Sequence, residues 1–479
     1  MNFRVWGCEK NQVGVVPFFW YLIEPVGFWR DLRLGIYCKV IYRMCNCIRC
    51  YTSWGGELEN IVLVDEVFRT SRDLPMNYIS RSHVDDLFVD SLVKQTHIVI
   101  HGSSKQGKTS LRKKNLLESD YISVTCSNTW SIADINESIL KRAGYQITVS
   151  ESKTIKGTSK VSLSVGLTDT KIGSDISMEL ARQINKKSLE LDLENTNDVI
   201  SALKEIDFDK FIVLEDFHYL EIDAQVDFSI ALKAYHEESS LCFIIVGVWL
   251  EDDRLTTFNG DLAGRIVSIN ADKWLDENID ELFTVSEALL NISFTENFKN
   301  CVKQKCNGSI FLVQQLCMKV CEAQSISKTQ EEQIVVAENI DITDEIKSVL
   351  DMHTGRFTKF LMDFSAGFQP TELELYKWIL FALVTIDEKF LLEGLPIQAL
   401  RRQIQTAHPK KSEVSVKKLS GALNKAVSLQ LDNRTKPIVF EYDSSRSRVK
   451  VVDKSFLLWK QFQELPELLE YIDLEELAK

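Results

Sequence analysis

The sequence of 479 residues lacks three features that would each assign it to a particular class of protein. Its 11 cysteines are odd in number and show no disulfide-framework spacing. Its net charge is −13, so there is no general excess of basic residues. It has no uninterrupted apolar run of the ~20 residues that a membrane-spanning helix needs. These absences argue against a disulfide-rich secreted scaffold and a general polyanion binder. They favour a cytoplasmic protein without stable membrane insertion.

The first 55 residues differ in composition from the rest of the chain. They hold five of the 11 cysteines and four of the nine tryptophans. Pro17 and Pro25 interrupt their apolar run, whereas a signal peptide would have an unbroken apolar stretch after a basic start. The segment Cys45-x-Cys47-x-x-Cys50 lacks the second ligand pair of a zinc site. We interpret residues 1–55 as an atypical leader, with Met44 as an alternative translation start and a membrane anchor as the less favoured reading.

A glycine-rich segment follows the short apolar run at residues 96–101 and precedes a helical pattern. Residues 102–109 fit G-x-x-x-x-G-K-[ST], in which successive backbone N–H groups and the start of the helix point toward phosphates. Lys108 is expected to reach the β- and γ-phosphate oxygens, and the Thr109 hydroxyl to ligate Mg²⁺. The motif predicts binding of ATP and Mg²⁺ through Gly102, Ser103, Ser104, Lys105, Gln106, Gly107, Lys108, Thr109 and Ser110.

Two acidic residues end a second apolar run, at residues 211–214. A buried strand that ends in carboxylates is where P-loop ATPases hold their metal ion. We therefore expect Glu215 to ligate Mg²⁺ and Asp216 to polarise the attacking water as a catalytic residue. The alternative is a strand that meets solvent with polar side chains. His218 is expected to be a packed or solvent-facing residue.

Together these two motifs resemble the AAA+ and STAND branch of P-loop ATPases, near the origin-recognition replication initiators. The segment Tyr78-Ile-Ser-Arg81 is similar to the lead-in that packs near adenine in that branch, which implies that Arg81 binds the nucleotide. The segment that contains Arg265 is similar to one that carries an arginine finger, which implies a catalytic role in a neighbouring subunit. The alternative for Arg265 is a surface arginine before a strand.

The chain also departs from that branch in three places. Glu215-Asp216 stands where Asp-Glu or Asp-Asp is usual, which puts the rate of hydrolysis in doubt but not binding. No Asn, Ser or Thr follows the strand that ends at Val246, where the γ-phosphate is usually sensed. The lid has Ser309-Ile-Phe where initiators tend to carry a sensing arginine. The lid is therefore more similar to that of STAND proteins.

A basic segment near the C-terminus stands out in an acidic chain. Residues 396–460 hold 14 Lys and Arg against 5 Asp and Glu, a balance of +9 that leaves −22 for the rest. Three helical patterns followed by two alternating runs predict a winged helix. Its phosphate-contacting residues on duplex DNA would be Lys417, Lys418, Lys425, Arg446 and Arg448. The alternative is a domain that folds back on the ATPase as a latch.

The predicted fold class is α/β. Strand-like runs that alternate with helical patterns over residues 61–270, beginning with a run at 61–68, predict a parallel sheet with helices on both faces. A helical lid and a winged helix are expected to follow. Alternation around Val161, Leu163 and Val165 predicts a β-hairpin insertion, either a surface ribbon or a docking element. The expected regions are the leader 1–55, the ATPase core 56–275 with its insertion at 154–182, the lid 276–345 and the winged-helix-like domain 346–479.

These motifs predict an ATPase that acts as a molecular switch. ATP binding and slow hydrolysis would control the interaction of the winged helix with DNA or protein. The domain combination resembles ATPases of phage defence and mobile elements. One alternative is an initiator-like ATPase that loads or remodels DNA, and another is a DNA-binding regulator that holds ATP without hydrolysing it. No nuclease, protease or toll-type motif is present, so an effector role would need self-association or a partner protein.

Overall fold

The computed structural model describes residues 61–71, 73–149, 160–165, 189–338 and 340–478. The leader 1–55 and most of the expected insertion at 154–182 lie outside these residues. Within the described part of the chain, none of the helices combines the length and the apolar character needed to cross a bilayer. The described cysteines are free thiols.

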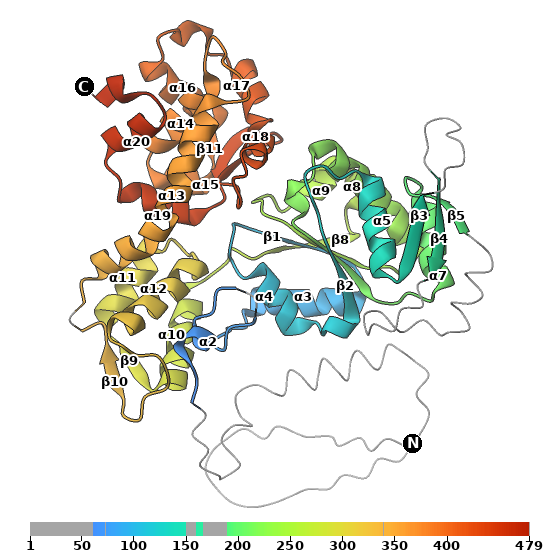
Figure 1. Ribbon diagram of the computed structural model, residues 1–479, viewed down its shortest axis with the longest axis horizontal. Helices are drawn as coiled ribbons and strands as arrows, with labels where there is room; N and C mark the ends of the chain where they lie inside the picture. The colour runs from blue at the N-terminus through green and yellow to red at the C-terminus, as the bar shows by residue number, and fades with distance from the viewer. Residues whose placement is uncertain (1–60, 72, 150–159, 166–188, 339, 479) are drawn as a thin grey trace, which may run out of the picture. The chain divides into compact units, whose positions relative to one another are not determined.

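A parallel sheet of five strands forms the core of the ATPase region (Figure 1). Its strand order is β2-β6-β7-β1-β8. Parallel pairing aligns the carboxyl ends of all five strands at one edge, where open α/β sheets bind ligands. The strands are β1 (His97–His101), β2 (Tyr121–Thr125), β6 (Phe211–Glu215), β7 (Phe243–Val246) and β8 (Ile266–Asn270).

Both faces of this sheet are covered by helices (Figure 1). Successive side chains of a strand point to opposite faces. Ile98 and Ile100 accordingly pack with one set of helices, whereas Val99 packs with the other. The first set is α3 (Ser82–Lys94) and α4 (Lys108–Asn115), and the second is α5 (Ile132–Arg142), α7 (Thr196–Glu205) and α8 (Ile222–Glu238). The predicted α/β fold class is confirmed.

The insertion differs from the expected hairpin. Strand β4 (Lys160–Val165) pairs antiparallel with β3 (Tyr145–Val149) on one side and β5 (Leu189–Asp192) on the other. Both partners lie outside the expected bounds of 154–182. Alternation of apolar residues identifies a strand with one buried face, but it does not say which segments pair with it.

A helical lid follows the sheet. It comprises α10 (Asp276–Leu290), α11 (Glu296–Lys305) and α12 (Ile310–Ala323), with a parallel pair of short strands, β9 (Ile292–Phe294) and β10 (Ile334–Val336). Residues 61–68, predicted as a strand, instead contain helix α2 (Val64–Val67). Its apolar side chains pack in the lid core and not in the sheet, which is why the strand prediction was wrong.

The C-terminal domain begins within a long helix, α13 (Ile342–Ala366), so the expected boundary at 345/346 falls inside one element. The domain also contains a three-stranded antiparallel sheet of order β11-β13-β12. The third expected helix is divided at Asn424 and Lys425 into α17 and α18. The elements are α14 (Leu375–Thr385), α15 (Glu388–Glu393), β11 (Leu395–Pro396), α16 (Ile397–Ala407), α17 (Val416–Leu423), α18 (Ala426–Asp432), β12 (Phe440–Asp443), β13 (Arg448–Val451), α19 (Lys454–Gln461) and α20 (Leu465–Tyr471).

Candidate nucleotide-binding site

The glycine-rich loop joins β1 to α4. Gly102 and Gly107 have φ angles of 134° and 82°, which residues other than glycine rarely adopt. A Cβ atom on Gly102 would also lie 3.0 Å from Oδ1 of Asp272. Gly107 caps the start of α4, so the loop delivers its backbone directly to a helix N-terminus. The geometry explains why glycine is needed at both positions.

Lys108 is buried at the first position of α4. Its Nζ donates hydrogen bonds to the carbonyl oxygens of Gly102, at 2.9 Å, and Ser103, at 2.6 Å. Burial lowers the pKa of Lys108 to about 8, and the charges of Asp272, Glu215 and Asp216 oppose this shift. The ammonium group is therefore held inside the loop that is predicted to surround the phosphates.

Asp272, which follows β8, binds Ser103 of the phosphate loop. Its carboxylate accepts hydrogen bonds from the Ser103 N–H, at 2.8 and 2.9 Å, and from the Ser103 hydroxyl, at 2.6 Å. This residue was not predicted from the sequence, because it belongs to no recognised motif. Its position just after the strand beside β1 is the one signal that could have identified it.

The two predicted carboxylates end β6 and enter different surroundings. Glu215 Oε1 accepts a hydrogen bond from Arg112 Nε at 3.1 Å, and a second guanidinium nitrogen of Arg112 lies at 3.0 Å. Burial raises the pKa of Glu215, whereas Arg112 lowers it. Burial also raises the pKa of Asp216, opposed by Lys436 and Lys108. Arg112, missed from the sequence, lies on α4 four residues after Lys108.

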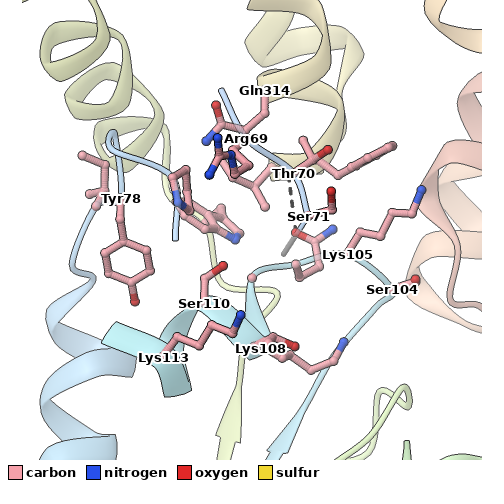
Figure 2. A pocket seen from close by; sticks show the side chains of 18 of the residues that line it. Arg69, Thr70, Ser71, Tyr78, Ser104, Lys105, Lys108, Ser110, Lys113 and Gln314 are labelled. Carbon is pink, nitrogen blue, oxygen red and sulfur yellow. Dashed lines mark hydrogen bonds between the residues drawn. The ribbon is translucent and has the colours of Figure 1, made fainter. Parts of the chain in front are cut away.

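A pocket of about 360 Å³ is lined by most of the residues that were predicted to bind the phosphates. Residues 104–110 of the loop, Glu215, Asp216 and Arg81 all line it. Figure 2 shows Ser104, Lys105, Lys108 and Ser110 around its lower side. Thr109 and Glu215 supply a hydroxyl and a carboxylate to one space, and Mg²⁺ binds oxygen donors of this kind. The donor set therefore fits the predicted metal.

The pocket also has apolar side chains in its wall, beside polar residues that include Arg69, Thr70 and Ser71. Ile79, Leu282, Ile310 and Phe311 line it. The side-chain amides of Asn77 and Gln314 bond to each other in both directions, at 2.8 and 2.9 Å, and Gln314 also lines the pocket. Such a mixture of apolar walls and a few fixed polar groups is typical of a small-molecule site.

Arg81 has a supporting position in this wall. It is 1% exposed, and its guanidinium donates to the Ala271 carbonyl oxygen at 2.7 Å. The guanidinium carbon lies 4.0 Å from the centre of the Trp274 ring. Arg81 thus ties the start of α3 to the end of β8 while it lines the pocket.

The segment after β7, which has no polar residue to sense the γ-phosphate, contains Trp249. Trp249 is fully buried, and a Cβ atom on Gly247 would lie 1.6 Å from its ring. The Trp249 carbonyl oxygen accepts a hydrogen bond from the Gly102 N–H at 2.9 Å. The loop after β7 therefore contacts the base of the phosphate loop through its backbone.

Arg265 lies away from this pocket. It immediately precedes β8, and its carbonyl oxygen accepts a hydrogen bond from the N–H of His97, the first residue of β1. This is the sheet edge opposite the pocket. Its guanidinium pairs with Glu237 at 2.6 Å. A finger role would therefore require a second copy of the chain, and it stays a prediction.

The five residues expected to contact nucleic acid fall into two groups. Lys417, Lys418 and Lys425 are exposed on and beside α17. Arg446 instead pairs with both oxygens of Asp253 in the ATPase core, at 2.9 and 3.0 Å. Arg448 donates to the Gly394 carbonyl oxygen at 2.7 Å. The expectation that all five face a ligand together does not describe this structure, because the two arginines already have protein partners.

Comparisons with known proteins give similarity at low identity. No known protein family and no curated protein matches the sequence. Among solved structures, the chain is similar to the Walker-type ATPase PABY2304 of Pyrococcus abyssi, at 13% identity and a TM-score of 0.47, over 83% of this chain and 100% of the other.

Two proteins of Aeropyrum pernix are also similar. The ORC2 protein, determined as ADPNP–ADP complexes, has 11% identity and a TM-score of 0.43, over 86% of this chain and 98% of its own. The ORC1 protein, in complex with DNA, has 9% identity and a TM-score of 0.40, over 85% and 98%. At such identities, the chemistry of the site depends on the residues of this chain.

Proposed function

We propose that this chain binds ATP with Mg²⁺, hydrolyses it slowly, and uses the nucleotide state to control what its C-terminal domain contacts. The observation that carries this proposal is the single pocket that joins the phosphate loop, Lys108, Glu215 and Asp216 beneath a helical lid. A nucleoside triphosphate needs this combination of backbone N–H groups, a cation and two carboxylates.

Each residue has a distinct role in the proposed reaction. Lys108 and the N–H groups at the start of α4 bind the phosphates. Thr109 and Glu215 hold Mg²⁺, which when bound neutralises charge on the phosphate oxygens. Asp216 accepts a proton from the attacking water, and the water oxygen bonds to the γ-phosphorus. The bond from the γ-phosphorus to the β–γ bridging oxygen breaks at the same time, which yields ADP and phosphate.

Two features support slow turnover. Both contacts of Arg112 fall on Glu215 Oε1, so this carboxylate shares its negative charge with a guanidinium group and would hold a metal ion through its other oxygen. The water-polarising role then falls to Asp216, whose side chain is one methylene shorter than the glutamate found at this position in many related ATPases. A shorter reach places the carboxylate farther from the attacking water, and general-base catalysis depends on hydrogen-bond distance.

The test is phosphate release and ATP binding by purified protein beside two variants. Lys108→Ala should lose ATP binding, whereas Asp216→Asn should keep binding and lose release. Wild-type protein that binds no ATP would refute the proposal. If Asp216→Asn released phosphate at the wild-type rate, the catalytic role of Asp216 would be refuted. Wild-type protein that binds ATP but releases no phosphate would favour the regulator that holds ATP without hydrolysing it.

We interpret the C-terminal domain as a winged helix that binds duplex DNA, supported by the exposed lysines of α17. These lysines also favour the second candidate, an initiator-like ATPase that remodels DNA. Phosphate release that rises with duplex DNA would support this second candidate. Release that ignores DNA but responds to a protein partner would support the switch. A role in phage defence or mobile elements stays a prediction.

A further inference from the structure

The β12–β13 hairpin (residues 440–451) faces an acidic loop of the ATPase core, residues 251–253, which follows β7. Asp253 of this loop binds the Arg446 guanidinium through both carboxylate oxygens. Glu251 lies 3.4 Å from Lys450 Nζ. Two cations of the hairpin are thus paired with carboxylates from another part of the fold.

A second pair runs in the opposite direction and fixes the position of the hairpin. Arg254, next to the acidic loop, lies 3.1 Å from Glu441 on β12. The other oxygen of Glu441 accepts the Leu250 N–H at 3.2 Å. These groups are largely buried, and breaking a buried pair is strongly destabilising. The hairpin and the acidic loop therefore hold each other through groups of both signs.

The Arg446–Asp253 pair differs from the buried pairs because it lies at the rim. Its two side chains remain 43% and 51% exposed. Exposed ion pairs contribute little and are easily exchanged for other partners. An arginine can exchange a carboxylate for a phosphate, because both anions accept charge-assisted hydrogen bonds from its guanidinium group. A polyanion can therefore compete for Arg446 without unfolding the interface beneath it.

The acidic loop is also connected to the phosphate loop. Asp252 lies 3.0 Å from His101 Nε2, and His101 directly precedes Gly102. Trp249, two residues before the acidic loop, accepts the Gly102 N–H. On the hairpin side, the Val452 carbonyl oxygen accepts the Ser104 N–H at 2.8 Å. A shift of the phosphate loop would therefore displace both the segment that contains Asp253 and the hairpin that contains Arg446.

We propose that Asp253 of the acidic loop takes the place of a duplex phosphate at the β12–β13 hairpin, so that the Arg446–Asp253 pair and binding of duplex DNA by Arg446 exclude each other. This inference rests on the proposed function, because it assumes that the C-terminal domain binds duplex DNA. The mutual exclusion restrains the affinity for DNA while Arg446 is paired with Asp253. Nucleotide binding at the phosphate loop regulates this affinity through the two backbone contacts.

The test compares two aspartates that carry the same charge in similar settings. Asp253 pairs with Arg446, and Asp261 pairs with Lys233 at 2.6 Å with its side chain 61% exposed. Replacing either aspartate by alanine removes one negative charge. In fluorescence anisotropy with a short duplex, Asp253→Ala should bind about three- to tenfold more tightly than wild type, since it frees one phosphate contact. Asp261→Ala should stay within about twofold of wild type.

A second background separates competition from a general charge effect. In the Arg446→Ala protein, adding Asp253→Ala should give no further gain in affinity. A gain of the same size in both backgrounds would overturn the proposed competition. Hydrogen exchange without DNA gives an independent reading: the amides of residues 443–448 should exchange faster in Asp253→Ala than in Asp261→Ala, and equal exchange would also overturn it.

The binding results that would refute the proposed function differ from those that would refute only the competition. If wild type and every variant bound no duplex while ATP binding remained intact, the assignment of DNA as the partner would be refuted, and the competition with it. If wild type bound duplex but Asp253→Ala and Asp261→Ala had equal affinities, DNA binding would stand and only the competition would be refuted.

Discussion

The phosphate loop was predicted from a glycine-rich motif, whereas the DNA contacts of the C-terminal domain were predicted from positive charge, and the two predictions differ in outcome. At the phosphate loop, residues 104–110 and the carboxylates Glu215 and Asp216 line one pocket. In the C-terminal domain, the lysines of α17 are exposed, whereas the hairpin cations Arg446 and Lys450 are paired with the ATPase core. A backbone motif fixes the geometry of its residues, whereas net charge leaves open which partner each cation has.

The largest expected effect separates the two regions by ligand. Lys108→Ala removes the buried cation of the phosphate loop, and loss of one partner of a buried charged contact costs about 3–5 kcal/mol. ATP affinity measured by calorimetry should fall more than about 100-fold, as each 1.4 kcal/mol is a factor of ten. Lys417→Ala, the matched control in the C-terminal domain, should leave ATP affinity unchanged. Equal losses in the two variants would contradict the division of roles.

Asp216→Asn should separate hydrolysis from binding within the first region. A general base contributes roughly 10²–10⁴-fold to a rate, so kcat for phosphate release should fall by about 100-fold at the lower end of that range. ATP affinity should change by less than about threefold, because the amide keeps the size of the side chain. Asp272→Asn serves as the comparison, since Asp272 binds Ser103 of the loop and has no assigned part in the chemistry. If that variant also lost hydrolysis selectively, the assignment of Asp216 would fail.

The pH dependence of ATP binding follows from the burial of Lys108. Burial lowers the pKa of Lys108 to about 8, and bound phosphates must raise it because they favour the charged form. ATP affinity should therefore be constant below pH 8 and fall above it, by up to about tenfold per pH unit. Calorimetry at pH 7 and pH 9 checks this. In the Lys108→Arg variant, which stays charged throughout, affinity should be lower but nearly independent of pH.

Much of the fold and the phosphate site could be predicted because the signals are local. Apolar runs identified the strands of the sheet, and residues 102–109 specified the loop and the helix start together. Asp272 and Arg112 were missed because their roles depend on which strands and helices become neighbours, and no spacing in the sequence records that. Residues 61–68 were predicted as a strand for a related reason, since an apolar run does not reveal whether it meets a sheet or a lid.

The same limit applies to the ion pairs of the hairpin. Asp253 and Arg446 are 193 positions apart, and each alone is an ordinary surface residue. For the C-terminal domain, a latch on the ATPase was the alternative to DNA binding. The structure places residues suited to both roles in one domain, on different elements, so the alternatives need not compete for the same side chains.

The smallest expected effect tests this division directly. Lys417→Ala combined with Lys418→Ala should weaken binding of a short duplex about three- to tenfold and reduce its dependence on salt by about two phosphate contacts. Neither lysine has an ion pair with a residue in the described part of the chain, so both are available to phosphates. Arg446→Ala should change affinity by less than about twofold, because docking of the hairpin on Asp253 already withholds that guanidinium from DNA. Anisotropy titrations at several salt concentrations would measure both variants. A larger loss for Arg446→Ala than for the paired lysine variant would mean that the hairpin is undocked in solution, and that the two groups of cations bind DNA together.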